Sequence, residues 1–382
     1  MLAGFDFIYE QFEHTVKDGS GKTKKLCRKK NKMRGNRMKQ ICVKDGMRRL
    51  RSFCFALFVA AAVLVAPMQK AQAAERELVP MGNTVGIQIR TEGVLVVGLS
   101  ATGDGTSVSP AAVAGLLPGD IIIALGDEKI SSADDFRAAL EKLDGSAFII
   151  SYQRDGEEFQ SRIEPIIGEQ GIELGLWLRD SVSGIGTLTY FDPQSGDYGG
   201  LGHSINDVDS GVILPLRSGE ILESSVDSVV KGVPGAPGEL RGSFDMQSIC
   251  GSIDANTLNG IFGQLTSGIP DVSGAIPIGG ESEITLGKAS ILANISGTEV
   301  CEYEIEIVRV YRDEQADRNI MIRVTDARLL EKTGGIVQGM SGSPIIQSGR
   351  LIGAVTHVMV NDPSSGYGIS IEKMLSAGEN SR

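Results

Sequence analysis

The sequence predicts a mainly β protein, in which a small α/β module precedes a larger all-β domain. A chain of 382 residues has room for two or three domains. Glycine is abundant, with 49 residues, while aromatic residues make up only 5% of the chain, a balance typical of turn-rich β proteins. Short apolar segments alternate with Gly, Pro and Asp over much of the second half, which is the pattern of short strands joined by turns.

The charge is divided unevenly between an N-terminal segment and the rest of the chain. Residues 1–73 contain 16 Lys and Arg against 5 Asp and Glu, a net charge of +11. Because the whole chain carries −11, residues 74–382 carry −22. A body this acidic would repel phosphate groups, which argues against nucleic acid as a partner. Its charge bears mainly on solubility and on which substrates approach.

The N-terminal segment has the features of an export signal behind a basic extension. Residues 1–51 are polar and basic, and we expect them to be a disordered extension. Within residues 52–74, an uncharged apolar run at 53–66 follows basic residues and precedes small residues at 71–73, the spacing that signal peptidases read. The run is short for a membrane-spanning helix, which needs about 20 residues. We therefore predict a signal peptide, with an uncleaved membrane anchor as the alternative.

The position of this signal suggests a different start of translation. Export signals normally begin at the N-terminus, whereas this one begins near Met47. We hypothesise that translation starts at Met38 or Met47 and that the preceding residues are an over-extended gene prediction.

Residues 80–166 are expected to form the α/β module. Strands are predicted at 86–89 and 93–97, joined by a turn at 90–92. Helix starts are predicted at two serines: Ser109 precedes a proline, and Ser132 stands three residues before an aspartate. A last strand is predicted at residues 147–152.

Residues 111–122 carry the pattern A-x-x-A-G-L-x-x-G-D-x-I, which resembles a circularly permuted PDZ domain of bacterial proteases. PDZ domains bind an extended peptide by adding it to a sheet edge beside a helix. The resemblance places the carboxylate-binding loop at Thr84, Val85, Gly86 and Ile87. Two roles remain open for the module: binding a free peptide, or docking on the following domain.

Residues 167–382 are expected to form a closed or paired β-barrel domain. Strands are predicted at residues 186–190, 211–216, 289–295, 319–324 and 351–355. At residues 301–307 carboxylates alternate with mostly apolar side chains, which predicts a half-buried strand. Residues 248–265 are the exception, where a short helix or an irregular loop is predicted.

A glycine-rich loop at residues 334–344 has the features of a nucleophile loop. Gly339 and Gly342 flank Met340 and Ser341, so the backbone is free to turn and no bulky side chain blocks a peptide carbonyl. Ser341 is the candidate nucleophile, and the amides of Gly339 and Ser341 are the candidate oxyanion hole. Ser343 is the rival nucleophile, but it precedes a proline and is expected to support the turn.

A serine hydroxyl needs a base, and the chain has only three histidines, His14, His203 and His357. His14 precedes the predicted cleavage site. His203 follows a Gly-Gly-Leu-Gly turn and comes before the serine in the chain, so it is the candidate base. His357 lies in a predicted strand and is expected to line the site or to pack.

The third member of the site, an acid that would orient the imidazole, is less sharply indicated. Asp326 ends a predicted strand 15 residues before Ser341 and is the candidate. Asp207 and Asp209 lie near His203 in the chain and are the alternatives.

The residues around the serine carry a second resemblance. Gly339-Met340-Ser341-Gly342-Ser343-Pro344 is similar to the G-D-S-G-G-P loop of chymotrypsin-like proteases. Together with residues 202–204 and 355–358, and over about residues 75–380, the chain resembles the stage IV sporulation protein B peptidases. These are PDZ-bearing serine endopeptidases of endospore formers. The resemblance also points to Asp326 as the acid.

The family resemblance implies a physiological setting as well as an activity. It implies an exported serine endopeptidase that acts near a membrane, in the space between the two membranes around the forespore. Its substrate would be the extracytoplasmic part of a membrane-bound regulator of an intramembrane protease. It also implies self-cleavage near the mature N-terminus and control by the PDZ domain.

The alternative function is a non-catalytic PDZ-bearing scaffold that holds peptides at the membrane surface. Neither function calls for a cofactor, because nucleotide-binding glycine patterns and H-E-x-x-H are absent from the sequence. Too few Cys and His remain outside the N-terminal segment for a structural zinc site. Cys250 and Cys301 either pair as a disulfide in an oxidising compartment or stay as free thiols.

Overall fold

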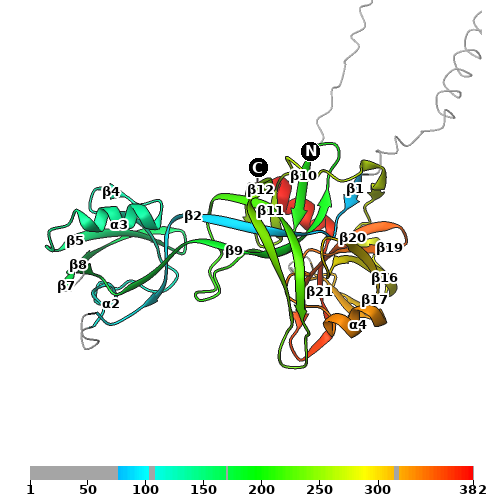
Figure 1. Ribbon diagram of the computed structural model, residues 1–382. Helices are drawn as coiled ribbons and strands as arrows, with labels where there is room; N and C mark the ends of the chain where they lie inside the picture. Colours follow the sequence, from blue (N-terminus) through cyan, green and yellow to red (C-terminus); the bar gives the residue numbers. More distant parts are fainter. Residues whose placement is uncertain (1–75, 103–107, 169–170, 314–317, 382) are drawn as a thin grey trace, which may run out of the picture. The chain divides into compact units, whose positions relative to one another are not determined.

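A computed structural model describes residues 76–102, 108–168, 171–313 and 318–381 (Figure 1). The predicted basic extension (1–51), the predicted signal (52–74) and the proposed start sites lie outside the described residues. No helix within the described ranges is both long enough and apolar enough to cross a membrane.

A single long strand, β2 (Thr84–Leu99), replaces the two strands predicted at residues 86–89 and 93–97. It pairs antiparallel with β9 (Leu176–Phe191) along most of its length, with an irregularity between Arg90 and Leu95. Gly93 lies in this irregularity with φ +86°, and a Cβ there would stand 2.6 Å from the carbonyl oxygen of Ile122. The glycine therefore absorbs a local kink instead of ending the strand.

The α/β module is built around the second half of β2. Its other elements are α2 (Pro110–Val113), β3 (Ile121–Leu125), β4 (Glu128–Lys129), α3 (Ala133–Glu141), β5 (Phe148–Arg154), β6 (Glu157–Ile163), β7 (Ile166–Gly168) and β8 (Gly171–Glu173). Both predicted caps are confirmed, because Ser109 accepts a hydrogen bond from Ala112 N and Ser132 accepts one from Asp135 N. The buried core of the module runs from Val94 to Leu174 in the chain.

The predicted peptide-binding residues Thr84, Val85, Gly86 and Ile87 require a correction. They lie in the first half of β2, which pairs with β9 on one side and with β11 (Leu216–Val230) on the other. Val85 and Ile87 belong to a core cluster separate from that of the α/β module. A strand whose two edges are already paired has no free backbone groups for an added peptide, so this segment is not a peptide-binding loop.

The first half of the next domain gathers around the same part of β2. Its remaining elements are β1 (Glu77–Pro80), β10 (Asp197–Gly200), β12 (Glu239–Ile253), β13 (Ala255–Thr257), β14 (Gly260–Gln264), β15 (Ile276–Pro277), and the short 3-10 helices η1 (Val272–Gly274) and η2 (Glu281–Glu283). Residues 248–265 form strands, so the expected helix or loop there is wrong. β12 pairs with the preceding strand β11, whereas β14 pairs with its neighbour β13 and with β10, which comes from a more distant part of the sequence.

The second half is a closed antiparallel barrel in the order β16-β17-β18-β21-β20-β19 (Figure 1). The strands are β16 (Gly287–Asn294), β17 (Val300–Val310), β18 (Ile320–Val324), β19 (Pro344–Gln347), β20 (Arg350–Met359) and β21 (Asp362–Ser370), with α4 (Ala327–Thr333) before β19 and α5 (Ile371–Asn380) after β21. The alternation predicted at residues 301–307 is confirmed, because Tyr303, Ile305 and Ile307 are buried while Glu302 and Glu304 are exposed. Cys250 and Cys301 are both free thiols.

Candidate active site

The loop that carries Ser341 runs between α4 and β19, and its conformation depends on two glycines. Gly339 and Gly342 have φ values of +96° and +100°, which L side chains rarely adopt. A Cβ at Gly342 would also collide with the carbonyl oxygen of Thr187. The Gly342 amide donates to Val355 O at 2.7 Å, so the loop is held between β9 and β20.

The carbonyl groups of this loop are turned toward β9. Thr187 donates its amide to Ser341 O at 3.1 Å and its hydroxyl to Gly339 O at 2.7 Å. Among the described residues, no group accepts a hydrogen bond from the amides of Gly339 or Ser341. These two N–H groups therefore remain the predicted donors to a substrate oxyanion.

Ser341 and Ser343 differ in accessibility. Ser341 is half-buried and lines a cavity of about 480 Å³, where its hydroxyl donates to Thr356 O at 2.6 Å. Ser343 has no exposed surface, and its hydroxyl makes no hydrogen bond. It supports the turn through its backbone, since its amide donates to Met340 O and its carbonyl accepts from Val355 N. Ser341 is therefore the serine that a substrate can reach.

His203 reaches the same cavity through a tight turn after β10. Leu201 and Gly202 both have positive φ, and a Cβ at Gly202 would lie 2.9 Å from Thr356 Cγ2. The glycine lets the chain pass close to β20, and the imidazole lines the same cavity as Ser341. His203 Nδ1 lies 2.8 Å from Ser204 O. Because a carbonyl oxygen only accepts, Nδ1 carries the proton and Nε2 keeps its lone pair for a serine proton.

The surroundings of His203 keep the imidazole neutral. Burial lowers its pKa, the hydrogen bond to Ser204 O opposes this, and the cation of Arg318 lowers it further. A neutral imidazole is the form that a general base requires.

His357, on β20, packs against the catalytic histidine. The two rings have centroids 4.9 Å apart and are tilted by 48°. Arg318 Nη2 donates to His357 Nε2 at 3.2 Å, so the proton of the neutral ring is on Nδ1, which is buried without a partner. Burial first, then His203 and Arg318, lower the pKa of His357 to about 4. The structure thus places His357 in the wall of the cavity as a neutral side chain.

The structure does not bring Asp326 to His203. Asp326 is the N-cap of α4 and accepts from the amides of Arg328 and Leu329. Its carboxylate also pairs with the Arg328 guanidinium at 2.8 Å, and this hydrogen bond lowers the pKa of Asp326 to about 2. It is not among the residues that line the cavity. An aspartate between a strand and a helix has the same sequence pattern whether it caps the helix or serves as a catalytic acid.

The alternative acids are also occupied elsewhere. Asp207 is buried, pairs with Arg179 and accepts from the amide and hydroxyl of Ser210. Asp209 pairs with the same arginine. In this arrangement the group that orients the His203 imidazole is the carbonyl of Ser204, which the sequence analysis did not single out. Its position directly after His203 is the only signal that the sequence offers.

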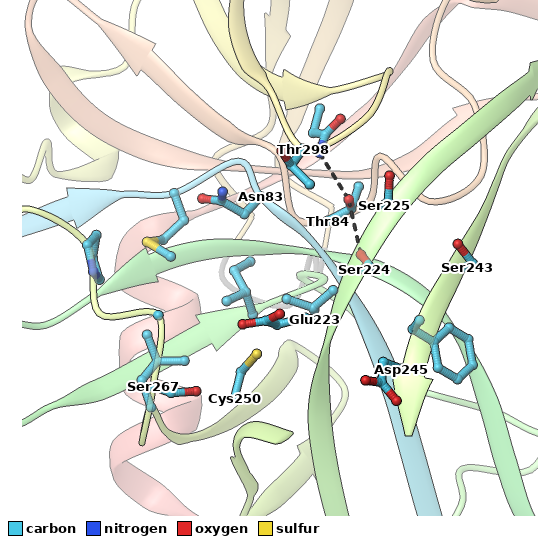
Figure 2. Close-up of a pocket in the computed structure, with 18 residues that line it drawn as sticks. Asn83, Thr84, Glu223, Ser224, Ser225, Ser243, Asp245, Cys250, Ser267 and Thr298 are labelled. Atoms are coloured by element: carbon cyan, nitrogen blue, oxygen red, sulfur yellow. Dashed lines mark hydrogen bonds between the residues drawn. The ribbon is translucent and has the colours of Figure 1, made fainter. Parts of the chain in front are cut away.

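A second pocket, of about 630 Å³, lies where β11 and β12 meet the start of β2 (Figure 2). Thr84 links its walls through hydrogen bonds with Ser224 Oγ and Asn294 Nδ2. Burial, aided by the nearby Glu223 carboxylate, raises the pKa of the Cys250 thiol. The thiol therefore stays protonated, and no histidine lines the pocket to activate it. Across the described residues, no group of three or more His, Cys, Asp or Glu is placed to hold a metal ion.

Comparisons with known proteins agree with this geometry. The sequence profile of the SpoIVB peptidase S55 family matches residues 170–375, and a PDZ domain profile matches residues 107–154. The comparison with curated proteins finds no match.

Distant similarity is found among solved structures. The active form of the Rv3671c protease from M. tuberculosis has 15% identity and a TM-score of 0.30, over 52% of this chain and 74% of that one. The HtrA-type protease AlgW with a decapeptide has 13% identity and a TM-score of 0.31, over 56% of this chain and 55% of that one.

The S55 match covers more than half of the chain and includes both His203 and Ser341. The same two residues line one cavity beside free backbone amides. The chain therefore belongs to the SpoIVB peptidase S55 family, and it is a serine endopeptidase with a PDZ domain.

Proposed function

We propose that this peptidase is exported and cleaves a membrane-associated regulatory protein in a sporulation signalling pathway. The observation that carries the catalytic part is the shared cavity of His203 and Ser341, next to the amides of Gly339 and Ser341. Family membership supports the pathway. The apolar run at residues 53–66 supports export.

Catalysis begins with a movement of the Ser341 hydroxyl. In the structure this hydroxyl donates to Thr356 O, so it turns about its Cα–Cβ bond to reach Nε2 of His203. The imidazole takes the proton as Ser341 attacks the substrate carbonyl, and the amides of Gly339 and Ser341 bind the resulting oxyanion.

The second half of the reaction uses the same groups. The imidazolium returns its proton to the leaving amine, which leaves an acyl-enzyme on Ser341. A water molecule then gives a proton to His203 as its oxygen attacks the acyl carbonyl. The bond from the acyl carbon to Ser341 Oγ breaks, and the imidazolium returns the proton to that oxygen as the new carboxyl product leaves. Throughout the reaction, Nδ1 of His203 keeps its proton and donates it in a hydrogen bond to Ser204 O. This bond holds the ring in the tautomer that leaves Nε2 free to accept a proton.

The physiological substrate is proposed to be the extracytoplasmic part of a membrane-bound regulator of an intramembrane protease. The site of action is the space between the two forespore membranes, with the enzyme close to the membrane surface. Self-cleavage near the mature N-terminus and control by the PDZ domain complete the proposal. Membership of the sporulation peptidase family supports each of these points.

Three alanine variants test the catalytic assignment. Ser341→Ala and His203→Ala are expected to abolish cleavage of an unfolded protein substrate, whereas Ser343→Ala keeps activity. A residual rate on the order of 10³-fold over water is expected without the nucleophile, from oxyanion binding alone. An active Ser341→Ala together with an inactive Ser343→Ala would reassign the nucleophile. Failure of the wild type to react with a serine-directed fluorophosphonate would favour the PDZ-bearing scaffold instead.

A further inference from the structure

The catalytic cavity is lined by apolar side chains on two sides. One wall is formed by Ile185, Leu201 and Ile205, and the other by Ile336, Val337 and Val358. None of the described residues that line the cavity is Asp, Glu, Lys or Arg. The polar part of the lining consists of the loop that carries Ser341, the two histidine side chains, and uncharged polar side chains such as Asn206 and Gln338.

The second wall is part of the barrel core and is therefore rigid. Ile336 and Val337 are 2% and 1% exposed, and Val358 packs against the same core cluster. A Cβ at Gly366 of β21 would lie 2.5 Å from Ile336 Cδ1, so the isoleucine fills the space that this glycine leaves open. Side chains held this tightly keep the shape of the cavity fixed.

This wall is built from the segments that hold the nucleophile. Ile336 and Val337 lie in the nucleophile loop, shortly before Gly339. Val358 lies on β20 shortly after Thr356, whose carbonyl oxygen accepts the hydrogen bond from the Ser341 hydroxyl. A substrate carbonyl that is attacked by Ser341 has its oxygen at the amides of Gly339 and Ser341. The side chains of these two segments line the same cavity as Gly339 and Ser341, so they are within reach of the side chain of that substrate residue.

We propose that Ile336, Val337 and Val358 form the specificity pocket, and that the enzyme cleaves after aliphatic residues such as Val, Ile and Leu while rejecting charged ones. The inference rests on the peptidase activity proposed above. An aliphatic side chain gains free energy by leaving water for this pocket. A charged one would lose its hydration without meeting an opposite charge.

The test uses the full chain and a peptide library that varies the residue at the scissile carbonyl. The kcat/KM values for Val, Ile and Leu are expected to exceed those for Asp and Lys by about 100-fold. Val358→Ala enlarges the pocket and is expected to raise kcat/KM for Phe relative to Val by about 10-fold. Val358→Phe fills the pocket and is expected to raise kcat/KM for Ala relative to Val by about 10-fold.

Val272→Phe is the matched control, because Val272 is 54% exposed and does not line the cavity. Its cleavage profile is expected to equal that of the wild type. Fluorophosphonate labelling distinguishes a wrong assignment of the pocket from a lack of peptidase activity. Labelled protein that cleaves equally well after charged and aliphatic residues, or a labelled Val358→Phe variant with an unchanged profile, would overturn the pocket alone. Wild-type protein that does not label overturns both the pocket and the peptidase proposal.

Discussion

The charge on His203 is controlled by burial and by a few neighbours, and Arg318 is the cation among the described residues that acts on it. The base is active when neutral, so the acid limb of kcat/KM follows its pKa. Burial and the Arg318 cation lower this pKa, while the Ser204 carbonyl raises it. His357, held neutral between His203 and Arg318, faces the same ring.

Arg318→Gln is therefore expected to raise the pKa of His203 and to move the acid limb of kcat/KM to higher pH. The measurement is the pH profile of peptide hydrolysis. Arg323→Gln serves as the control, because Arg323 is exposed and its ion pair within the described residues is with Glu306. An acid limb that stays in place or moves to lower pH in Arg318→Gln would show that the cation does not act on the base.

Asp326 offers a direct choice between a structural and a catalytic role. Asp326→Ala removes the cap of α4, so it is expected to cost about 1 kcal/mol of stability and to leave kcat close to the wild-type value. As a catalytic acid, its loss would lower kcat on the order of 10⁴-fold. Thermal unfolding and kcat measured on the same samples distinguish the structural role from the catalytic role. A decrease in kcat on the order of 10⁴-fold would show that Asp326 is the catalytic acid.

The pH dependence of this stability effect has a definite sign. The pKa of Asp326 is about 2 in the folded chain against an ordinary value of 3.8. At pH values above the ordinary pKa of 3.8, the ionised carboxylate therefore makes its full contribution to the stability of the fold. This contribution is lost as the pH falls toward 2. The difference in the free energy of unfolding between wild type and Asp326→Ala is expected to narrow over that pH range.

The residues of the site differ in how far the sequence predicted them. Glycine-rich turns contain Ser341, Gly339 and His203. These turns could be recognised from the sequence because the glycines are needed where the backbone itself turns, whatever its distant partners are. The partner of His203 was not predictable in the same way. Asp207 is bound by Arg179, which lies on a different strand, and Asp326 is bound by its own helix. Which carboxylate is free depends on such contacts and not on position in the sequence.

At the level of elements, the nucleophile loop depends on its contact with β9. Gly342→Ala would add a Cβ against the Thr187 carbonyl in a backbone conformation that already disfavours alanine. Gly349 is the matched control, because it also has positive φ, +75°, but has nothing within 4 Å of its Cβ position. Gly342→Ala is expected to be about 2 kcal/mol less stable than Gly349→Ala and to lose activity. Equal stability and activity in the two variants would contradict the packing of the loop on β9.

Elements with a local pattern were predictable, and those that depend on distant partners were not. The alternation in β17 and the serine caps of α2 and α3 are properties of a few neighbouring residues. Whether β2 is one strand or two depends on β9 and β11, which pair with it across the interruption and along its first half. Within residues 248–265, β14 likewise pairs with β10, which lies far from it in the sequence.

For the whole molecule, the acidic charge and the uncharged cavity act on different parts of a substrate. Residues 74–382 carry a net −22, which attracts cationic peptides before they bind. The kcat/KM of a peptide with Lys residues outside the cavity is expected to fall as salt increases, and that of an Asp-flanked peptide to rise. Hydrolysis measured across a salt series checks this, with a neutral-flanked peptide as the control. Identical salt dependence for all three peptides would mean that the net charge does not influence association.

Mass spectrometry of the fluorophosphonate-treated protein tests the central pairing of His203 and Ser341 most directly. The full chain is labelled near neutral pH, digested, and the modified residue is identified in wild type and in His203→Ala. We expect one adduct, on Ser341, that is lost or strongly reduced in His203→Ala. An adduct on Ser343, or a Ser341 adduct that forms equally fast without His203, would contradict it.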